Sequence, residues 1–240
     1  AAMTLSLACS SADPASGDEA PPAAATKGLD ESPYILAQQF DLSISVTTTA
    51  LRGSYSRLNK DHTCEGLDTS PPVSWEGVPA NAKSLVLLFD DPASDELAGL
   101  DTWTHWVVYS IPPEVTEIVV AQPTSTLSAL GIKLGKNDYG DISYKGPCPT
   151  PTLVYTPSAS GVLPGGRVGH TPPRVAEERP YYFRLYALDR EIDLESGASR
   201  NVLLREIDGH IVGAGVAEVP FRSTKKIACR NLTCLSDLKR

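Results

Sequence analysis

The sequence predicts an all-β fold, an antiparallel β-sandwich of the Greek-key kind with one or two short peripheral helices. The first observation is a continuous apolar run at 85–89 that stops at Asp90-Asp91-Pro92. Such a run is typical of a buried central strand that ends at a rim, because proline cannot donate to a ladder and carboxylates resist burial.

The second observation is the alternation of side chains along 181–188. One face of this segment is apolar and is expected to pack on the core. The other face carries Tyr182, Arg184 and Tyr186 and is expected to lie against a wetter surface.

The remaining elements follow from local pattern. Period-two alternation predicts a half-buried first strand at 40–46, and β-branched and aromatic residues predict a second central strand at 103–111. Short strands are expected at 116–120 and 211–219, with ordered loops at 53–72 and 139–149. Near-helical spacing of apolar residues over 199–207, followed by Gly209, predicts one amphipathic helix.

The chain of 240 residues is expected to hold one domain at 34–240, preceded by a leader and tether at 1–33. Small and apolar residues lead to Cys9, and an Ala/Pro/Ser-rich stretch follows. This pattern predicts a lipid anchor at Cys9 and a place in the bacterial cell envelope, periplasmic or on the surface. The alternative is a disordered tail that carries one thiol.

The charge balance restricts the partners. The chain has 21 basic and 29 acidic residues, a net charge of −8, and no basic run longer than a pair, which argues against nucleic acid. No stretch approaches the ~20 apolar residues that a spanning helix needs, so membrane contact is expected only through a lipid anchor.

Four further cysteines allow two disulfides in three pairings. Cys229 and Cys234 are close in sequence and could close a small loop. Cys64 and Cys148 could be neighbours, paired or reduced. A metal site is disfavoured, because two near neighbours and two distant singles lack the usual paired-knuckle spacing.

The candidate site is expected where the two central strands meet. Adjacent strands would bring Asp90, Asp91, Trp103 and His105 to one neighbourhood, and a carboxylate, an imidazole and an aromatic wall suit a small polar or anionic ligand. The alternative is a turn signal at Asp-Pro, a strand histidine and core tryptophans.

Further motifs occur in order along the chain: Thr63-Cys64-Glu65-Gly66, Ser70 to Pro79, Asp-Asp-Pro, Trp-x-His-Trp, Gly140 to Pro149, Arg179 to Asp189, and Asp208 to Ile211. Together they resemble the phosphatidylethanolamine-binding protein family, in its bacterial and archaeal branch. The resemblance covers roughly 42–221 and implies a β-sandwich with a shallow pocket for phosphate-like or carboxylate anions, interpreted as stand-ins for a phospholipid headgroup.

The resemblance also assigns roles. It implies that Asp91 accepts from a protonated group, Trp103 forms a wall, His105 donates to an anion and Tyr181 offers a hydroxyl. The loop of Gly146, Pro147 and Cys148 would offer the backbone N–H groups of Gly146 and Cys148.

Two positions depart from the family pattern. The second acid falls on Ala93, unless Asp90 or Asp95 substitutes, and the second histidine falls on Arg179. Arg179 could hold an anion through its charged fork, or His170 could replace the histidine. Alternatively, Arg179 pairs at the surface with Glu177 or Glu178.

The segment at about 150–178 is an insertion relative to the family, and 153–155 with 161–163 could form a hairpin or an irregular flap beside the pocket. We expect a binding protein for a small anion or headgroup. Alternatives are a regulator of a protein partner, such as a kinase or serine protease, and an enzyme with Cys148 as nucleophile. No cofactor or metal is predicted, and no nucleophile-elbow motif is present.

Overall fold

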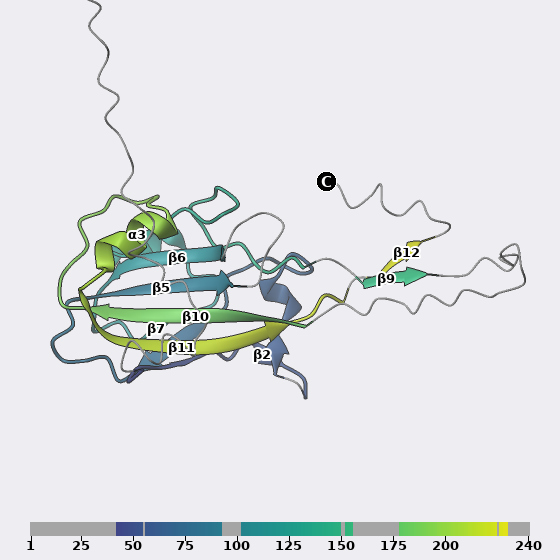
Figure 1. The fold of residues 1–240 in the computed structure, drawn as a ribbon, viewed down its shortest axis with the longest axis horizontal. Helices are drawn as coiled ribbons and strands as arrows, with labels where there is room; N and C mark the ends of the chain where they lie inside the picture. Colours follow the sequence, from purple (N-terminus) through teal and green to yellow (C-terminus); the bar gives the residue numbers. More distant parts are fainter. Residues whose placement is uncertain are drawn as a thin grey trace, which may run out of the picture.

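Two antiparallel sheets form the body of the molecule (Figure 1). The computed structural model describes residues 42–54, 56–92, 102–149, 152–155, 178–224 and 226–229. The larger sheet contains, in spatial order, β11 (Ile211–Phe221), β10 (Arg179–Leu188), β5 (Ser84–Asp91), β6 (Trp103–Ile111) and β8 (Lys133–Leu134). The smaller sheet contains β1 (Ser45–Thr47), β4 (Val73–Glu76) and β7 (Glu117–Ile118). The predicted β-rich fold is confirmed.

Short elements complete the described chain. β2 (Leu51–Arg52) pairs with β3 (Arg57–Leu58), and β9 (Thr152–Tyr155) pairs in parallel with β12 (Lys226–Cys229). The helices are η1 (Lys60–His62), α2 (Thr124–Ala129) and α3 (Arg200–Ile207). The second half of the predicted hairpin, 161–163, lies outside the described residues. Within the described part, no helix has the length and apolar character needed to cross a bilayer.

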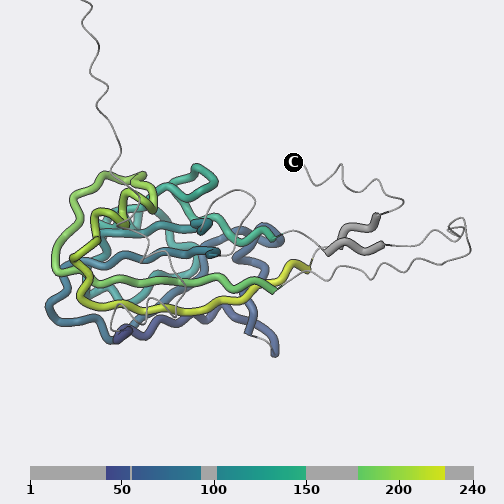
Figure 2. Tube along the Cα trace, viewed as in Figure 1, coloured from purple at the N-terminus to yellow at the C-terminus, as the bar shows by residue number. Residues whose placement is uncertain are grey.

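The central strand β5 is buried along its whole length. It lies between β10 and β6 and pairs with both in antiparallel register. One face of the sheet packs on the smaller sheet through a cluster that includes Trp75, Phe89 and Phe183. In Figure 2 the purple N-terminal part of the described chain runs beside the yellow β11, where the Ile44 N–H donates to the Ala214 carbonyl at 3.1 Å. Both faces of β5 are therefore internal, which explains its unbroken apolar run.

Helix α3 covers the other face of the large sheet (Figure 1). Ser199 caps its N-terminus by accepting a hydrogen bond from the Val202 N–H at 3.4 Å. Leu203, Leu204 and Ile207 then pack against β5 and β6. An amphipathic helix needs such a partner face to be stable.

The expectation of a wetter surface for the second face of β10 is wrong. Arg184 is fully buried and Tyr186 is 1% exposed, because α3 closes over them. The alternation along the strand was predicted, but an arginine on a strand does not by itself mark a solvent face. The buried charge of Arg184 is balanced by Asp90. Oδ2 of Asp90 lies 3.5 Å from Nε of Arg184 and 3.5 Å from Nε of Arg200.

Candidate functional site

Three strand ends meet at the candidate site. Asp91 is the last residue of β5 and pairs with Trp103, the first residue of β6. Asp90 pairs with Tyr182 of β10, so Tyr181 and Arg179 arrive at the same end of the sheet. The structure therefore brings Asp91, Trp103, His105, Arg179 and Tyr181 into one cluster, as the sequence predicted for these positions.

Asp90 does not belong to this cluster. Neighbours on a strand point to opposite faces, and Asp90 is fully buried on the α3 side, while Asp91 faces Tyr181 and Arg179. The expectation that Asp90 joins Asp91 in one neighbourhood is wrong, and Asp91 itself is only 3% exposed. Asp90 therefore cannot supply a second carboxylate to the pocket. Ala93, Asp95 and His170 lie outside the described residues.

A β-bulge places His105. Phe89 pairs with Trp106 and Asp90 pairs with Thr104, which leaves His105 as the extra residue on β6. A bulge bends a strand and re-aims a side chain. The imidazole consequently lies over the same core face as Phe89, with ring centroids 5.6 Å apart, and 5.4 Å from the ring of Tyr181.

The backbone of Lys145 holds His105 on both sides. The Lys145 N–H donates to the His105 carbonyl at 3.0 Å, and Nδ1 of the imidazole lies 2.8 Å from the Lys145 carbonyl oxygen. Because a carbonyl only accepts, Nδ1 carries the proton and Nε2 is the basic nitrogen of the neutral ring. Burial lowers the pKa of His105, against the opposing effects of the Lys145 carbonyl and of Asp91. The ring is neutral at pH 7.

Lowering the pH is expected to destabilise the protein through His105. The pKa of this group in the folded state lies below 6.5, its ordinary value in the unfolded chain. At a pH between these two pKa values, the imidazole is protonated in the unfolded state but not in the folded state. The contribution of His105 to the free energy of unfolding is therefore complete above pH 6.5 and decreases as the pH falls below it. Urea unfolding at about pH 7.5 and about pH 5.5 should show a smaller loss for His105→Gln than for the wild type. Equal losses would contradict this account.

Tyr181, Asp91 and Arg179 form a chain of contacts above the imidazole. The Tyr181 hydroxyl donates a hydrogen bond to the Asp91 carboxylate, and burial together with this acidic neighbour raises the pKa of Tyr181. Nη1 of Arg179 lies 3.3 Å from Oδ2 of Asp91. The Arg179 side chain is 34% exposed, whereas Tyr181 is 1% exposed. Arg179 is thus the charged group of this cluster that meets solvent.

Of the two surface partners predicted for Arg179, Glu178 is not the residue that it contacts. Glu178 pairs with Arg57, and Arg179 pairs with Asp91. Glu177 lies outside the described residues. A guanidinium has five N–H donors in a planar fork, so one contact with Asp91 leaves donor capacity on its outer edge.

Aromatic rings form the rim of the cluster. The half-buried Trp103 contacts Tyr139 edge to face, with ring centroids 5.3 Å apart, and Tyr139 lies 5.9 Å from His105. Tyr139, which is 41% exposed and lies in a polar turn, was not predicted from the sequence as a site residue. The only signal was an aromatic residue inside the motif loop 139–149, where a surface position would favour a polar side chain.

The loop that carries Gly146, Pro147 and Cys148 also contains Lys145, whose backbone holds His105. The Gly146 N–H donates to Oδ1 of Asp68 at 2.7 Å, so it is not offered to a ligand as expected. A Cβ on Gly146 would lie 2.4 Å from the His62 carbonyl oxygen, which explains the glycine. Pro147 is buried.

Cys148 is covalently bound. It forms a disulfide with Cys64, with the two Cα atoms 5.3 Å apart. The structure thus contains the paired alternative for these two cysteines, in which Cys148 is not a thiol nucleophile. Cys9 and Cys234 lie outside the described residues, so the predicted lipid anchor and the predicted Cys229–Cys234 pair stay predictions. Among the described residues, no group of three metal-ligating side chains is assembled.

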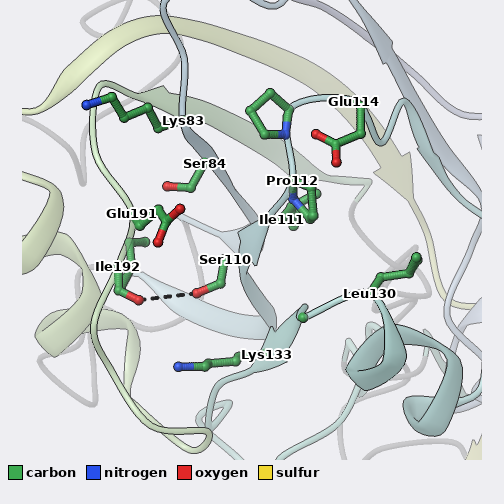
Figure 3. Close-up of a pocket in the computed structure, with 12 residues that line it drawn as sticks. Lys83, Ser84, Ser110, Ile111, Pro112, Glu114, Leu130, Lys133, Glu191 and Ile192 are labelled. Carbon is green, nitrogen blue, oxygen red and sulfur yellow. Dashed lines mark hydrogen bonds between the residues drawn. The ribbon is translucent and has the colours of Figure 1, made fainter.

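A separate hollow of about 500 Å³ lies where β5 begins and β6 ends, at the opposite end of the strands from Asp91 (Figure 3). Two of its polar side chains bond the segment 190–194: Ser84 donates to the carbonyl of residue 190 at 2.6 Å, and Lys133 donates to that of residue 194 at 2.7 Å. None of the site residues predicted from sequence lines it. These contacts fasten a loop to the sheet.

The fold is an antiparallel β-sandwich, and the motif residues lie together at one end of its large sheet. Both features agree with the family that the sequence resembles. The family model for phosphatidylethanolamine-binding protein matches residues 52–154. A UPF0098 protein of Methanothermobacter thermautotrophicus is 39% identical over 157 residues, which are 65% of this chain and 85% of that protein. The chain belongs to the phosphatidylethanolamine-binding protein family.

Further relatives agree with this assignment. A UPF0098 protein of Pyrococcus horikoshii is 35% identical over 72% of this chain and 74% of its own length. The crystal structure of the PEBP homologue CT736 from Chlamydia trachomatis has a TM-score of 0.57 at 29% identity and covers 76% of this chain and 99% of that chain. E. coli YbcL has a TM-score of 0.58 at 24% identity, covers 76% of this chain and 99% of its own, and bears on the fold alone.

Proposed function

We propose that this protein binds a small phosphorylated molecule that also carries a protonated group, such as phosphoethanolamine. The observation that carries the proposal is the Arg179–Asp91 pair, 3.3 Å apart, above a floor of buried His105 and Tyr181. A cation and an anion side by side match a zwitterion better than a simple anion, because each end of the ligand meets an opposite charge.

Arg179 is the group that would bind the phosphate. Its guanidinium is always charged, and its planar fork fits two phosphate oxygens at once. Asp91 is nearly buried beneath it. A ligand that reaches Asp91 therefore requires Arg179 to move outward, a side-chain change of the kind that is common on binding.

Asp91 would receive the protonated end. It already accepts a hydrogen bond from Tyr181 and contacts Arg179. A carboxylate has about four acceptor positions, and an ammonium or a hydroxyl can donate to one of them. A fully deprotonated anion would instead be repelled by it. The neutral His105 has Nε2 as an acceptor and adds no positive charge that would offset this repulsion.

The rim completes the site. Trp103 and Tyr139 meet edge to face at 5.3 Å and provide an apolar wall. Aromatic walls beside a few placed polar groups are typical of small-ligand sites, and the aromatic face also favours an ammonium group. The alternatives of a regulated protein partner and of an enzyme have no comparable support among the described residues, since the inserted segment is described only at β9.

Isothermal titration with four ligands tests the proposal. Inorganic phosphate, phosphoethanolamine, phosphocholine and glycerophosphoethanolamine are titrated into wild type and Asp91→Asn. Phosphoethanolamine should bind the wild type most tightly, and phosphocholine more weakly because its quaternary ammonium cannot donate a hydrogen bond. Asp91→Asn should reduce this preference by about tenfold. Glycerophosphoethanolamine separates the sources: tight binding indicates a lipid headgroup, and weak binding indicates a free monoester. Absence of binding by all four would refute the proposal.

A further inference from the structure

The disulfide links two segments that are remote in sequence. Cys64 follows η1, and Cys148 lies in the loop at 144–149, 84 residues away. The Cys64 N–H also donates to the Pro147 carbonyl at 3.2 Å. Cys148 is exposed and Cys64 is half-buried. Cys148 is therefore the end of this disulfide that lies nearer to solvent.

The same loop holds His105. Lys145, three positions before Cys148, supplies the carbonyl that accepts from Nδ1 at 2.8 Å and the N–H that donates to the His105 backbone at 3.0 Å. The tautomer and the position of the imidazole thus depend on where the loop lies. The disulfide and the floor of the site are connected through three residues of chain.

Closely spaced noncovalent contacts, including an ion pair between Nζ of Lys145 and Oδ2 of Asp68 at 2.8 Å, also join the two segments. The Tyr144 hydroxyl donates to the His62 carbonyl at 2.6 Å, and Asp68 receives the Gly146 N–H at 2.7 Å. Asp68 has a φ of 56°, in the left-handed region that non-glycine residues seldom adopt. Such a conformation persists where its surroundings impose it, and the disulfide is the covalent part of those surroundings.

We infer that the Cys64–Cys148 disulfide regulates ligand binding at the Arg179–Asp91 site: its reduction by a small thiol loosens the 144–148 loop and frees His105 from its fixed position. The inference rests on the proposed function. In the first step, a thiolate attacks the Cys148 sulfur, the bond to Cys64 breaks, and Cys64 leaves as a thiolate that takes up a proton. A second thiolate then releases Cys148 as a thiol and forms the thiol's own disulfide, so two electrons pass to the protein.

Reduction is expected to loosen the 144–148 loop and not to unfold it, because the noncovalent contacts between the two segments remain. We expect reduction to weaken phosphoethanolamine binding about tenfold, within the range usual for coupling between two sites. The coupling is reciprocal. Bound ligand should therefore make the disulfide harder to reduce by the same factor of about ten in the equilibrium constant.

The experiment uses the full chain with only this pair of cysteines, that is, with Cys9→Ser, Cys229→Ser and Cys234→Ser. Phosphoethanolamine is titrated into the oxidised, the dithiothreitol-reduced and the reoxidised protein, with circular dichroism to verify folding. The matched control carries Cys64→Ser and Cys148→Ser in addition. The expected result is an affinity lost on reduction and regained on reoxidation, with the control at the weaker affinity in both buffers. Equal affinity in the oxidised and reduced protein would overturn the inference.

A readout without ligand separates this inference from the proposed function. The ¹⁵N imidazole spectrum, with His105 assigned through His105→Gln, should show the Nδ1–H tautomer in the oxidised protein and a mixture of tautomers after reduction. If the oxidised protein binds none of the ligands, the proposed function fails, and this spectrum still decides whether the disulfide fixes the position of His105. An unchanged tautomer on reduction would show that it does not and would overturn the inference.

Discussion

Arg179→Ala is expected to weaken phosphoethanolamine binding by about 2 to 3 kcal/mol, roughly 30- to 150-fold in Kd. The variant removes the only cation of the cluster described at this end of the sheet that is both in contact with Asp91 and one-third exposed. It also leaves the carboxylate of Asp91 to repel the phosphate. Isothermal titration against the wild type measures the change.

A second substitution at Arg179 separates the effect of its planar donors from that of its charge, and a substitution at Arg190 serves as the control. Arg179→Lys keeps the charge but loses the planar donors, so its affinity should lie between those of wild type and Arg179→Ala. Arg190→Ala is the matched control, because Arg190 is also partly exposed and ion-paired, with Glu206, beyond the other end of β10. It should bind like the wild type. An Arg179→Ala protein that is folded and binds with unchanged affinity would show that Arg179 does not hold the ligand.

Asp90→Asn is expected to lower the free energy of unfolding by about 3 to 5 kcal/mol. The carboxylate and both neighbouring guanidinium groups are buried, with side-chain exposures of 0% for Asp90 and Arg184 and 6% for Arg200. The substitution keeps the size of the side chain but removes the charge that balances two buried cations. Urea unfolding monitored by circular dichroism measures the loss.

The exposed residue Asp193 provides the control. Asp193→Asn should change stability by no more than about 0.5 kcal/mol. Replacing Asp90, Arg184 and Arg200 together by apolar residues of similar volume should recover most of the loss, because no charge then remains buried without compensation. If Asp90→Asn cost no more than Asp193→Asn, the buried charge cluster would have no role in stability.

The fold could be predicted largely from the sequence because its core strands carry strong local signals. The apolar run at 85–89 and the alternation at 181–188 both became strands of the large sheet, and the segment at 199–207 became α3. The prediction that failed was the solvent exposure of the β10 face that carries Arg184. The sequence at Arg184 resembles that of a solvent-facing strand, and its burial depends on Asp90 and Arg200, which are distant in sequence and meet it only in the fold.

The site was predictable in its members but not in its geometry. Motif residues indicated Asp91, Trp103, His105, Arg179 and Tyr181, and the structure groups them. The bulge that aims His105 depends on the register between β5 and β6, which no single segment specifies. The use of the Gly146 N–H by Asp68 is equally nonlocal. Tyr139 was missed because a tyrosine in a polar turn has no periodic pattern around it.

Titration of phosphoethanolamine into ¹⁵N-histidine-labelled protein, followed through the imidazole resonances, shows whether the cluster around Arg179 and Asp91 binds the ligand. The described part of the chain contains His62, His105 and His210; His105 lies near the start of β6, and His210 directly precedes β11. We expect a saturable shift of the His105 resonances in the wild type, with little change at His62 and His210, and loss of that shift in Arg179→Ala. A ligand that binds while His105 stays unshifted would contradict the proposal that this cluster is the binding site.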